Sequence, residues 1–144
     1  FINCSFENCV LSAVVFDQSR FVDTSFISSK VIGIDWTKTK ELQNLKFTKC
    51  QLNYSNFKLL KLPKLVMIDC EAKEVELIET DLTNSDLSGT DFTGSIFSKT
   101  NLSKANLKGA KNYFVDPRNN SIKRTQFSLP EAMTLLDNLG VIIE

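Results

Sequence analysis

The chain has 144 residues, enough for one domain, and its 17 basic and 17 acidic residues give a formal net charge of zero. With no excess of either sign, the overall charge does not point to nucleic acid or to any other charged partner. No run of about 18 apolar residues appears and no charged-then-apolar leader opens the chain, so we expect neither a membrane span nor a signal peptide.

In the first quarter of the chain, a large apolar residue recurs every five positions. These residues are Phe1, Phe6, Leu11, Phe16, Phe21, Phe26, Val31 and Trp36. The residues two places before a centre are mostly small, namely Cys4, Cys9, Val14, Ser19, Thr24, Ser29 and Ile34. Because positions two apart share one face of an extended segment, we expect both members of each pair to point inward.

After Trp36 the series slips by one residue. It resumes at Leu42, Phe47, Leu52, Phe57, Leu62, Met67 and Ala72, and continues through Leu77, Leu82, Leu87, Phe92, Phe97, Leu102 and Leu107. The polar segment 37–41 carries the extra residue, and we place a bulged corner or small loop there. A tolerated surface insertion explains this segment better than a functional loop does.

A period of five fits neither regular element. On an α-helix, five steps of about 100° spread the apolar residues around the cylinder, and on one strand an odd period sends successive ones to opposite faces. The conflict disappears if the chain turns a corner once per repeat. The period therefore predicts a solenoid coiled around a closed core.

The blocks SDLSG (85–89), TNLSK (100–104) and ANLKG (105–109) resemble the pentapeptide-repeat family, whose consensus is A(D/N)LXX. The resemblance implies an all-β solenoid, namely a right-handed quadrilateral parallel β-helix with four repeats per coil. The 22 centres then give five and a half coils. At a strand spacing of about 4.8 Å, the solenoid is expected to be about 26 Å long.

We place the repeat β-helix at residues 1–110 and a C-terminal capping module at residues 111–144. Ser128 and Glu131 predict the N-cap and capping box of a short α-helix, with Pro130 in its first turn and Gly140 at its end. The apolar stripe of this helix consists of Ala132, Leu135, Leu136 and Leu139. Two segments resemble the Qnr-type and McbG-like branch of the family, namely NYFVDP (112–117), which leads out of the coil, and FSLPEAMTLLDNLGVII (127–143) at the C-terminal end.

In that branch the helix and tail help to join two solenoids end to end, so the resemblance implies a homodimer. Its expected interface consists of Leu135, Leu136, Leu139, Val141, Ile142 and Ile143. The alternative is that the leucines only cover the last coil of a monomer. A short, very apolar tail on a neutral domain favours the dimer.

The sequence offers little for catalysis. The absence of histidine excludes Ser–His and Cys–His nucleophile arrangements and zinc ligation by histidine, and no phosphate-binding glycine motif occurs. Cys4, Cys9, Cys50 and Cys70 all take the small inward position, which indicates core filling rather than a zinc site or disulfides. We therefore expect a cytoplasmic protein that is not an enzyme and has no metal or cofactor.

Charge becomes informative when the chain is divided. Residues 1–68 have a net charge of +4, residues 69–91 of −7 and residues 92–144 of +3. The acidic residues of the middle segment are Asp69, Glu71, Glu74, Glu76, Glu79, Asp81, Asp86 and Asp91. We call these eight the acidic girdle, because 23 residues cover just over one coil and so wrap around the solenoid.

The resemblance suggests one hypothesis and the repeat another. Qnr-type members bind DNA gyrase and topoisomerase IV, which implies a topoisomerase-directed protein that protects against quinolones or a gyrase-binding toxin, with the girdle as partner surface. Some members are thought to imitate DNA, yet duplex DNA carries about 15 charges over 26 Å, and a neutral solenoid copies this poorly.

The second hypothesis is a generic interaction scaffold for another protein. Direct nucleic-acid binding is less favoured, because charged outward residues are needed for solubility.

Overall fold

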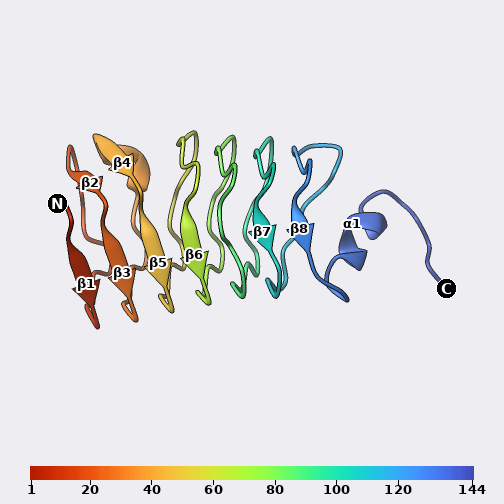
Figure 1. Cartoon of the computed structure of the whole chain (residues 1–144), viewed down its shortest axis with the longest axis horizontal. Coiled ribbons are helices and arrows are strands. Elements are labelled where there is room, and N and C mark those ends of the chain that lie inside the picture. The colour runs from red at the N-terminus through yellow and green to blue at the C-terminus, as the bar shows by residue number, and fades with distance from the viewer.

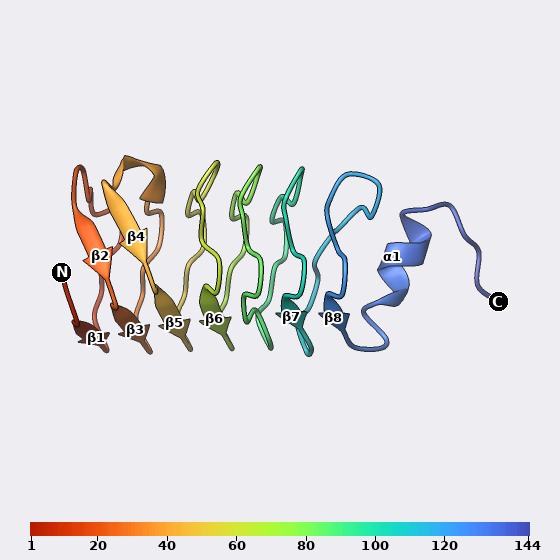
Figure 2. The same cartoon turned by 45° about the horizontal axis from the view of Figure 1, so that its top comes forward.

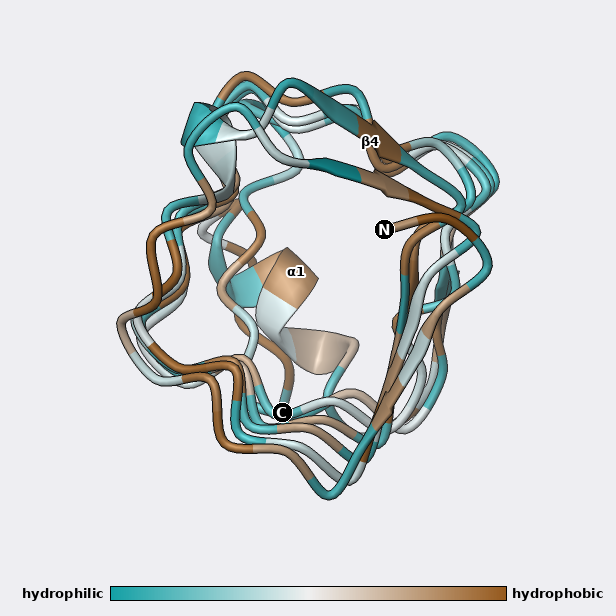
Figure 3. Ribbon diagram, turned by 90° about the vertical axis from the view of Figure 1, so that its left-hand side faces the viewer, coloured by the Kyte–Doolittle hydropathy of each residue, from teal (hydrophilic) through white to brown (hydrophobic).

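In the computed structural model, which describes residues 1–144, the chain winds into a parallel β-solenoid of about six turns (Figure 1). Residues about 20 positions apart lie side by side in neighbouring coils and pair in parallel, as Asp81 does with Asn101. Seen along its axis, the chain has a four-sided outline (Figure 3). The predicted four-sided β-helix is confirmed. We number the sides by the centres of one coil, so that Leu82, Leu87, Phe92 and Phe97 lie on sides 1 to 4.

The strands are short because the chain turns a corner once per repeat. They are β1 (Ser5–Glu7), β2 (Arg20–Val22), β3 (Ser25–Ile27), β4 (Glu41–Gln43), β5 (Lys46–Thr48), β6 (Val66–Ile68), β7 (Asn106–Leu107) and β8 (Gln126–Phe127). One sheet has the order β1-β3-β5-β6, and β2 pairs with β4 and β7 with β8. Isolated parallel bridges join the coils elsewhere. The structure contains no helix with the length and apolar character needed to cross a bilayer.

The central residues of the repeats form one continuous core. In the N-terminal half the core is aromatic, and rings stack from coil to coil, with 5.2 Å between the centroids of Phe26 and Phe47. Trp36 and Phe57 stack in the same way at 5.9 Å. In the C-terminal half the core positions are mostly leucine. Each coil therefore covers the core of the next.

The small inward residues satisfy carbonyl groups that would otherwise be buried without a partner. The hydroxyl of Thr80 donates to the carbonyl of Phe57 at 2.8 Å, and that of Thr90 donates to the carbonyl of Met67 at 2.6 Å. In both cases the acceptor is a central residue of the preceding coil. A buried carbonyl without a hydrogen bond costs about 1–3 kcal/mol, so these positions favour Ser and Thr.

The residue before each centre fixes the corner that follows. The carboxylates of Asp81, Asp86 and Asp91 each accept the backbone N–H two residues further on, at 3.0 to 3.1 Å. Asn101 and Asn106 make the same bond at 3.0 Å. The turn therefore needs the side-chain oxygen of Asp or Asn and not its charge.

The extra residue of segment 37–41 is accommodated in a 3₁₀-helix, η1 (Trp36–Lys38). The side chain of Asp35 accepts the N–H of Thr37 at 3.1 Å and caps this turn. Across the insertion the pairing offset becomes 21 residues, as in the pair of Arg20 and Glu41.

The coil continues past residue 110. Ser121 pairs with Asn101, and strand β8 pairs with β7. The hydroxyl of Thr125 donates to the carbonyl of Leu102 at 2.6 Å, which is the inward bond of a regular repeat. The boundary placed at residue 110 therefore lies inside a coil, and regular pairing ends at Phe127.

The helix α1 (Met133–Asp137) begins later than the sequence suggests. Ala132 stands at its N-cap and makes no side-chain cap bond, so the predicted capping box of Ser128 and Glu131 is wrong. The Ser128 hydroxyl instead accepts the N–H of Gly109 at 2.8 Å and binds the end of the chain to the solenoid.

The helix ends at Asp137, with Asn138 as its C-cap, and the predicted Gly140 closes the turn that follows. Gly140 has a φ of 73°, and the N–H of Val141 donates to the carbonyl of Leu136 at 3.1 Å, as in a glycine-terminated helix. Asn138 donates to the carbonyl of Val115 at 2.9 Å. The helix thus lies across the last coil, and the tail leads away from it (Figure 2).

We expect Thr90→Val to lower the free energy of unfolding by about 1–3 kcal/mol, because the Met67 carbonyl and the Cys70 N–H both lose their partner. Thr93→Val, at an exposed position, is the matched control and should change stability by less than about 0.5 kcal/mol. Urea denaturation followed by circular dichroism measures both. Equal effects of the two variants would contradict the role of the inward hydroxyl.

Candidate functional site

The acidic girdle surrounds the solenoid. Asp81, Asp86 and Asp91 stand one residue before the centres of sides 1, 2 and 3, and Glu76 holds the same position on side 4 of the preceding coil. The eight residues thus lie on successive coils and on all four sides, as the length of the segment predicts. The girdle forms a closed ring of carboxylates and not a stripe along the axis.

Side 3 carries the highest density of these carboxylates. Glu71 and Asp91 pair directly in neighbouring coils. Asp69 and Glu74 occupy the corners on either side of Glu71, each with a φ of 52°. The only base of the segment, Lys73, contacts Glu71 with 3.2 Å between Nζ and Oε1. Of the four carboxylates on this side, only Glu71 makes a salt bridge, although Lys111 of the next coil pairs with Asp91 through the backbone.

The position of one of these carboxylates depends on a glycine in the next coil. Gly89 lies directly below Asp69 in the next coil, and a Cβ atom there would come within 2.0 Å of Asp69 Oδ1. Gly89 also has a φ of 68°, a conformation that side chains rarely adopt. The Asp69 carboxylate can therefore lie across this corner only because residue 89 has no side chain.

Two carboxylates on side 3 are held in their ionised form. The hydrogen bond from Asn53, at 2.8 Å, and then the contact with Lys73 lower the pKa of Glu71. Partial burial opposes ionisation of Asp91, but hydrogen bonds from Thr93 and Asn112 outweigh it and lower its pKa. Both groups carry their charge at neutral pH.

Lysines offset part of the girdle's charge. Glu76 lies 3.6 Å from Lys58, and Glu79 lies 3.9 Å from Lys99. Exposed pairs of this kind contribute about 0–1 kcal/mol and can exchange partners. The four aspartates and Glu74 make no salt bridge. Most of the girdle is therefore free to meet a basic surface.

The expected dimer residues fall into two groups. Leu135 is partly buried and packs against the core of the last coil. The others are exposed, up to 84% for Ile142. Leu129 is also exposed, at 74%, and was missed because it lies outside the helical stripe. We define the C-terminal apolar surface as Leu129, Leu136, Leu139, Val141, Ile142 and Ile143.

The cysteines fill inward positions. Cys50 and Cys70 are buried in neighbouring coils, and each thiol donates to a backbone carbonyl, Cys50 to Phe26 at 3.2 Å and Cys70 to Ile68 at 3.3 Å. Contact with the Cys50 thiol and then burial raise the pKa of Cys70, which therefore stays a neutral thiol. No group of three or more His, Cys, Asp or Glu side chains is placed to hold a metal ion.

Two family models match the chain. One, described as a pentapeptide repeat region, covers residues 1–77, and the other, described as pentapeptide repeats in eight copies, covers residues 74–111. The chain belongs to the pentapeptide-repeat family. Its sequence matches no curated protein.

Several solved structures are similar to the chain. A trypsin-treated variant of QnrB1, a plasmid-mediated fluoroquinolone resistance protein, is 14% identical with a TM-score of 0.48, over 100% of this chain and 98% of that one. Full-length QnrB1 is 11% identical with a TM-score of 0.46, over 98% and 99%. Rfr23 from the cyanobacterium Cyanothece 51142 is 12% identical with a TM-score of 0.35, over 89% and 86%. Such distant similarity carries no information about partners.

We expect Glu71→Gln to make the melting temperature depend less on pH in the acid range. The pKa of Glu71 in the folded state lies below its ordinary value of 4.5, so its charge stabilises the fold above that pH. This contribution is lost as the pH falls through the lowered pKa. Thermal melts between about pH 7 and pH 3 measure the change. Glu74→Gln, which removes a carboxylate without a salt bridge, is the control, and an unchanged profile in the Glu71 variant contradicts the assignment.

Proposed function

We propose that this chain is a non-enzymatic, cytoplasmic protein-binding solenoid whose acidic girdle contacts the DNA-binding surface of a type II topoisomerase, either DNA gyrase or topoisomerase IV. The observation that supports this proposal is the gathering of eight carboxylates into one closed ring. A basic, DNA-binding surface is the natural complement of such a ring. The sequence resemblance of the C-terminal segment to the Qnr-type branch suggests which DNA-binding enzyme it meets.

The charge density of the girdle supports a local contact. The segment 69–91 winds just over one coil, which rises about 5 Å along the axis, and duplex DNA carries about three charges over that length. The net charge of the segment is −7. The girdle is thus locally at least as densely charged as DNA, whereas the chain as a whole, with zero net charge, is not.

Three aspartates of the girdle carry a charge that the fold does not require. Asp81, Asp86 and Asp91 cap their turns through one oxygen, and Asn101 and Asn106 make the same bond without a charge. An Asn at each aspartate position would therefore preserve the coil. The clustering of the charged alternative supports a role in binding.

We propose further that two chains form a homodimer through the C-terminal apolar surface. The helix α1 covers the last coil with Leu135, whereas Leu136 and the apolar residues that follow the helix are exposed. A twofold axis at this end would place two solenoids end to end, with one girdle on each. The basic coils of residues 92–144 would then lie between the two acidic girdles.

The alternative is a scaffold for a partner other than a topoisomerase. The salt bridges of Glu71, Glu76 and Glu79 with lysines favour the scaffold. A girdle that served only to bind a basic partner would bind it more tightly if these carboxylates had no lysine beside them. In this case binding would depend on the shape of one side and would survive the loss of girdle charge.

We expect the triple variant Asp81→Asn, Asp86→Asn and Asp91→Asn to fold normally and to lose activity toward the topoisomerase. Inhibition of gyrase supercoiling, or its rescue in the presence of a quinolone, should need at least about tenfold more protein, because three charges facing a basic surface are lost. A double variant with Asn101→Asp and Asn106→Asp extends the girdle by one coil, and we expect it to be more active.

Two outcomes of this assay count against the proposal. If the wild-type chain has no effect on gyrase or topoisomerase IV at micromolar concentration, a type II topoisomerase is not its partner. Wild-type activity in the triple asparagine variant shows that the girdle is not the contact surface and supports the scaffold.

We expect Ile142→Asp to convert the dimer into a monomer, because it puts a charge into an apolar interface at a position 84% exposed in the single chain. Size-exclusion chromatography with light scattering measures the mass, and the melting temperature at low concentration should be unchanged. Val15→Asp, also highly exposed but in the first coil, is the matched control. A wild-type chain that elutes as a monomer rules out the dimer.

A further inference from the structure

Strand β4 is the edge of a sheet although it lies within the solenoid. It pairs with β2 on one side and has no partner on the other. No backbone hydrogen bond joins residues 37–44 to residues 58–64 of the next coil. The ladder resumes one coil later, where the N–H of Leu62 donates to the carbonyl of Asp81 at 2.8 Å. One side of the β-helix is therefore open between two coils.

Three features of the sequence account for this opening. The one-residue insertion shifts the path of β4. Pro63 has no N–H, whereas Val22, at the same position two coils earlier, donates to the carbonyl of Phe1 at 3.0 Å. Leu65 fills the small inward position from which Thr24 donates to the same Phe1 carbonyl at 3.3 Å. Neither the backbone nor a hydroxyl group can bridge the two coils here.

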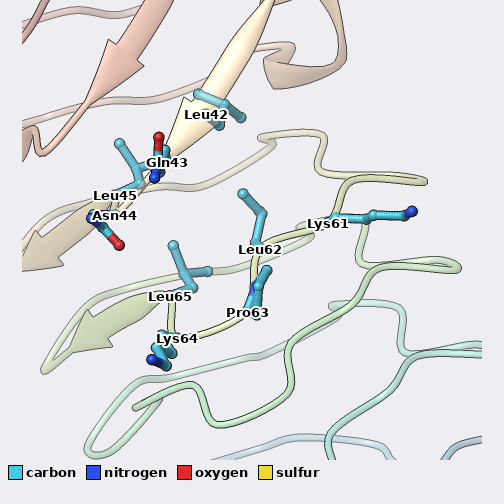
Figure 4. A pocket seen from close by; sticks show the side chains of 9 residues that line it. All are labelled: Leu42, Gln43, Asn44, Leu45, Lys61, Leu62, Pro63, Lys64 and Leu65. Carbon is cyan, nitrogen blue, oxygen red and sulfur yellow. The ribbon is translucent and has the colours of Figure 1, made fainter.

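The opening forms a cleft of about 390 Å³ (Figure 4). Its lining residues are Leu42, Gln43, Asn44, Leu45, Lys61, Leu62, Pro63, Lys64 and Leu65. Leu62 and Leu65 point from one coil toward Leu42 and Leu45 of the other, and Lys61 and Lys64 extend to opposite sides. The volume lies within the range of about 300–1,000 Å³ found for ligand sites.

The lining of the cleft carries positive charge and no negative charge. Lys61 and Lys64 belong to its lining, and no carboxylate does. A neighbouring hollow of about 300 Å³ shares Lys64 and adds Lys46 and Asp23. The Asp23 carboxylate already accepts a hydrogen bond from Asn44 at 2.7 Å. The cleft therefore offers apolar walls, a free strand edge and unpaired lysines.

We infer that this cleft binds an extended segment of a partner protein in which apolar and acidic residues alternate. The backbone of the segment adds to the free edge of β4, as in other complexes formed by strand addition. Because alternate side chains of a strand point to opposite faces, the apolar ones enter the cleft against Leu42 and Pro63. The acidic ones face outward and meet Lys61 and Lys64.

The cleft borders the acidic girdle, because Lys61 pairs with Asp81 of the next coil. The girdle selects a basic partner, whereas the cleft selects an acidic one. Binding of an acidic peptide and activity toward a topoisomerase are measured in separate assays, so the failure of one proposal is distinguishable from the failure of the other.

A direct test uses the ¹⁵N-labelled full chain and the blocked hexapeptide Ac-Glu-Leu-Glu-Val-Glu-Leu-NH₂. We expect its addition to shift the amide resonances of Leu42, Asn44 and Lys61 in NMR spectra. The same peptide with lysine in place of each glutamate should bind at least about tenfold more weakly, a difference of about 1.4 kcal/mol. A peptide methylated at alternate backbone nitrogens keeps every side chain but cannot pair with β4. We expect it, too, to bind at least about tenfold more weakly.

Charge variants locate the site. The double variant Lys61→Glu and Lys64→Glu should weaken binding of the acidic peptide by at least about tenfold, while Lys104→Glu with Lys108→Glu, on coils with a complete ladder, should leave it unchanged. All four lysines are exposed, so both variants should fold. No shift at about 2 mM peptide, shifts outside the cleft, or equal binding of the lysine peptide each overturn the proposal.

Discussion

The stacking of each coil on its neighbour in fixed register is the constraint on which the whole molecule depends. With strands of two or three residues, no side of a coil is stable alone, and each core residue is covered by one from the next coil. The inward hydroxyls add a second link, since they bind carbonyls of the coil before. A repeat of five residues satisfies both needs because it returns the same residue type to the same place after four corners.

The same constraint does not fix the charge of the side chains that face outward. At the position before each centre the fold needs a side-chain oxygen, and Asp or Asn supplies it equally well. Evolution can therefore change the surface potential of a coil without altering its backbone. The acidic girdle and the basic coils beside it are two surface choices on one framework, and each can suit a different partner.

The period of five was enough to predict a solenoid, because only a chain that turns at every repeat can bury all its centres, and the resemblance to the pentapeptide-repeat family supplied its four sides. The last coil was missed since Ile122 and Phe127, although in phase with Leu102 and Leu107, lie beyond the irregular run 112–120. The capping box failed because the Ser128 hydroxyl is used by Gly109, a contact that local sequence cannot show. The cleft also required the structure, because the insertion at 37–41 and Pro63 lie far apart in the sequence and act together only when the coils are stacked.

The open side at β4 has a consequence for how the chain comes apart. In a molecule held by nearest-neighbour contacts, cooperativity passes from one coil to the next, and a missing set of hydrogen bonds weakens the transfer at that place. The pairing of β5 with β6 and the bridges from Gln51 to Glu71 and from Asn56 to Glu76 still cross the junction on the other sides. We therefore expect the first three coils to behave as a semi-independent unit that can fray and re-form while the coils after them stay wound.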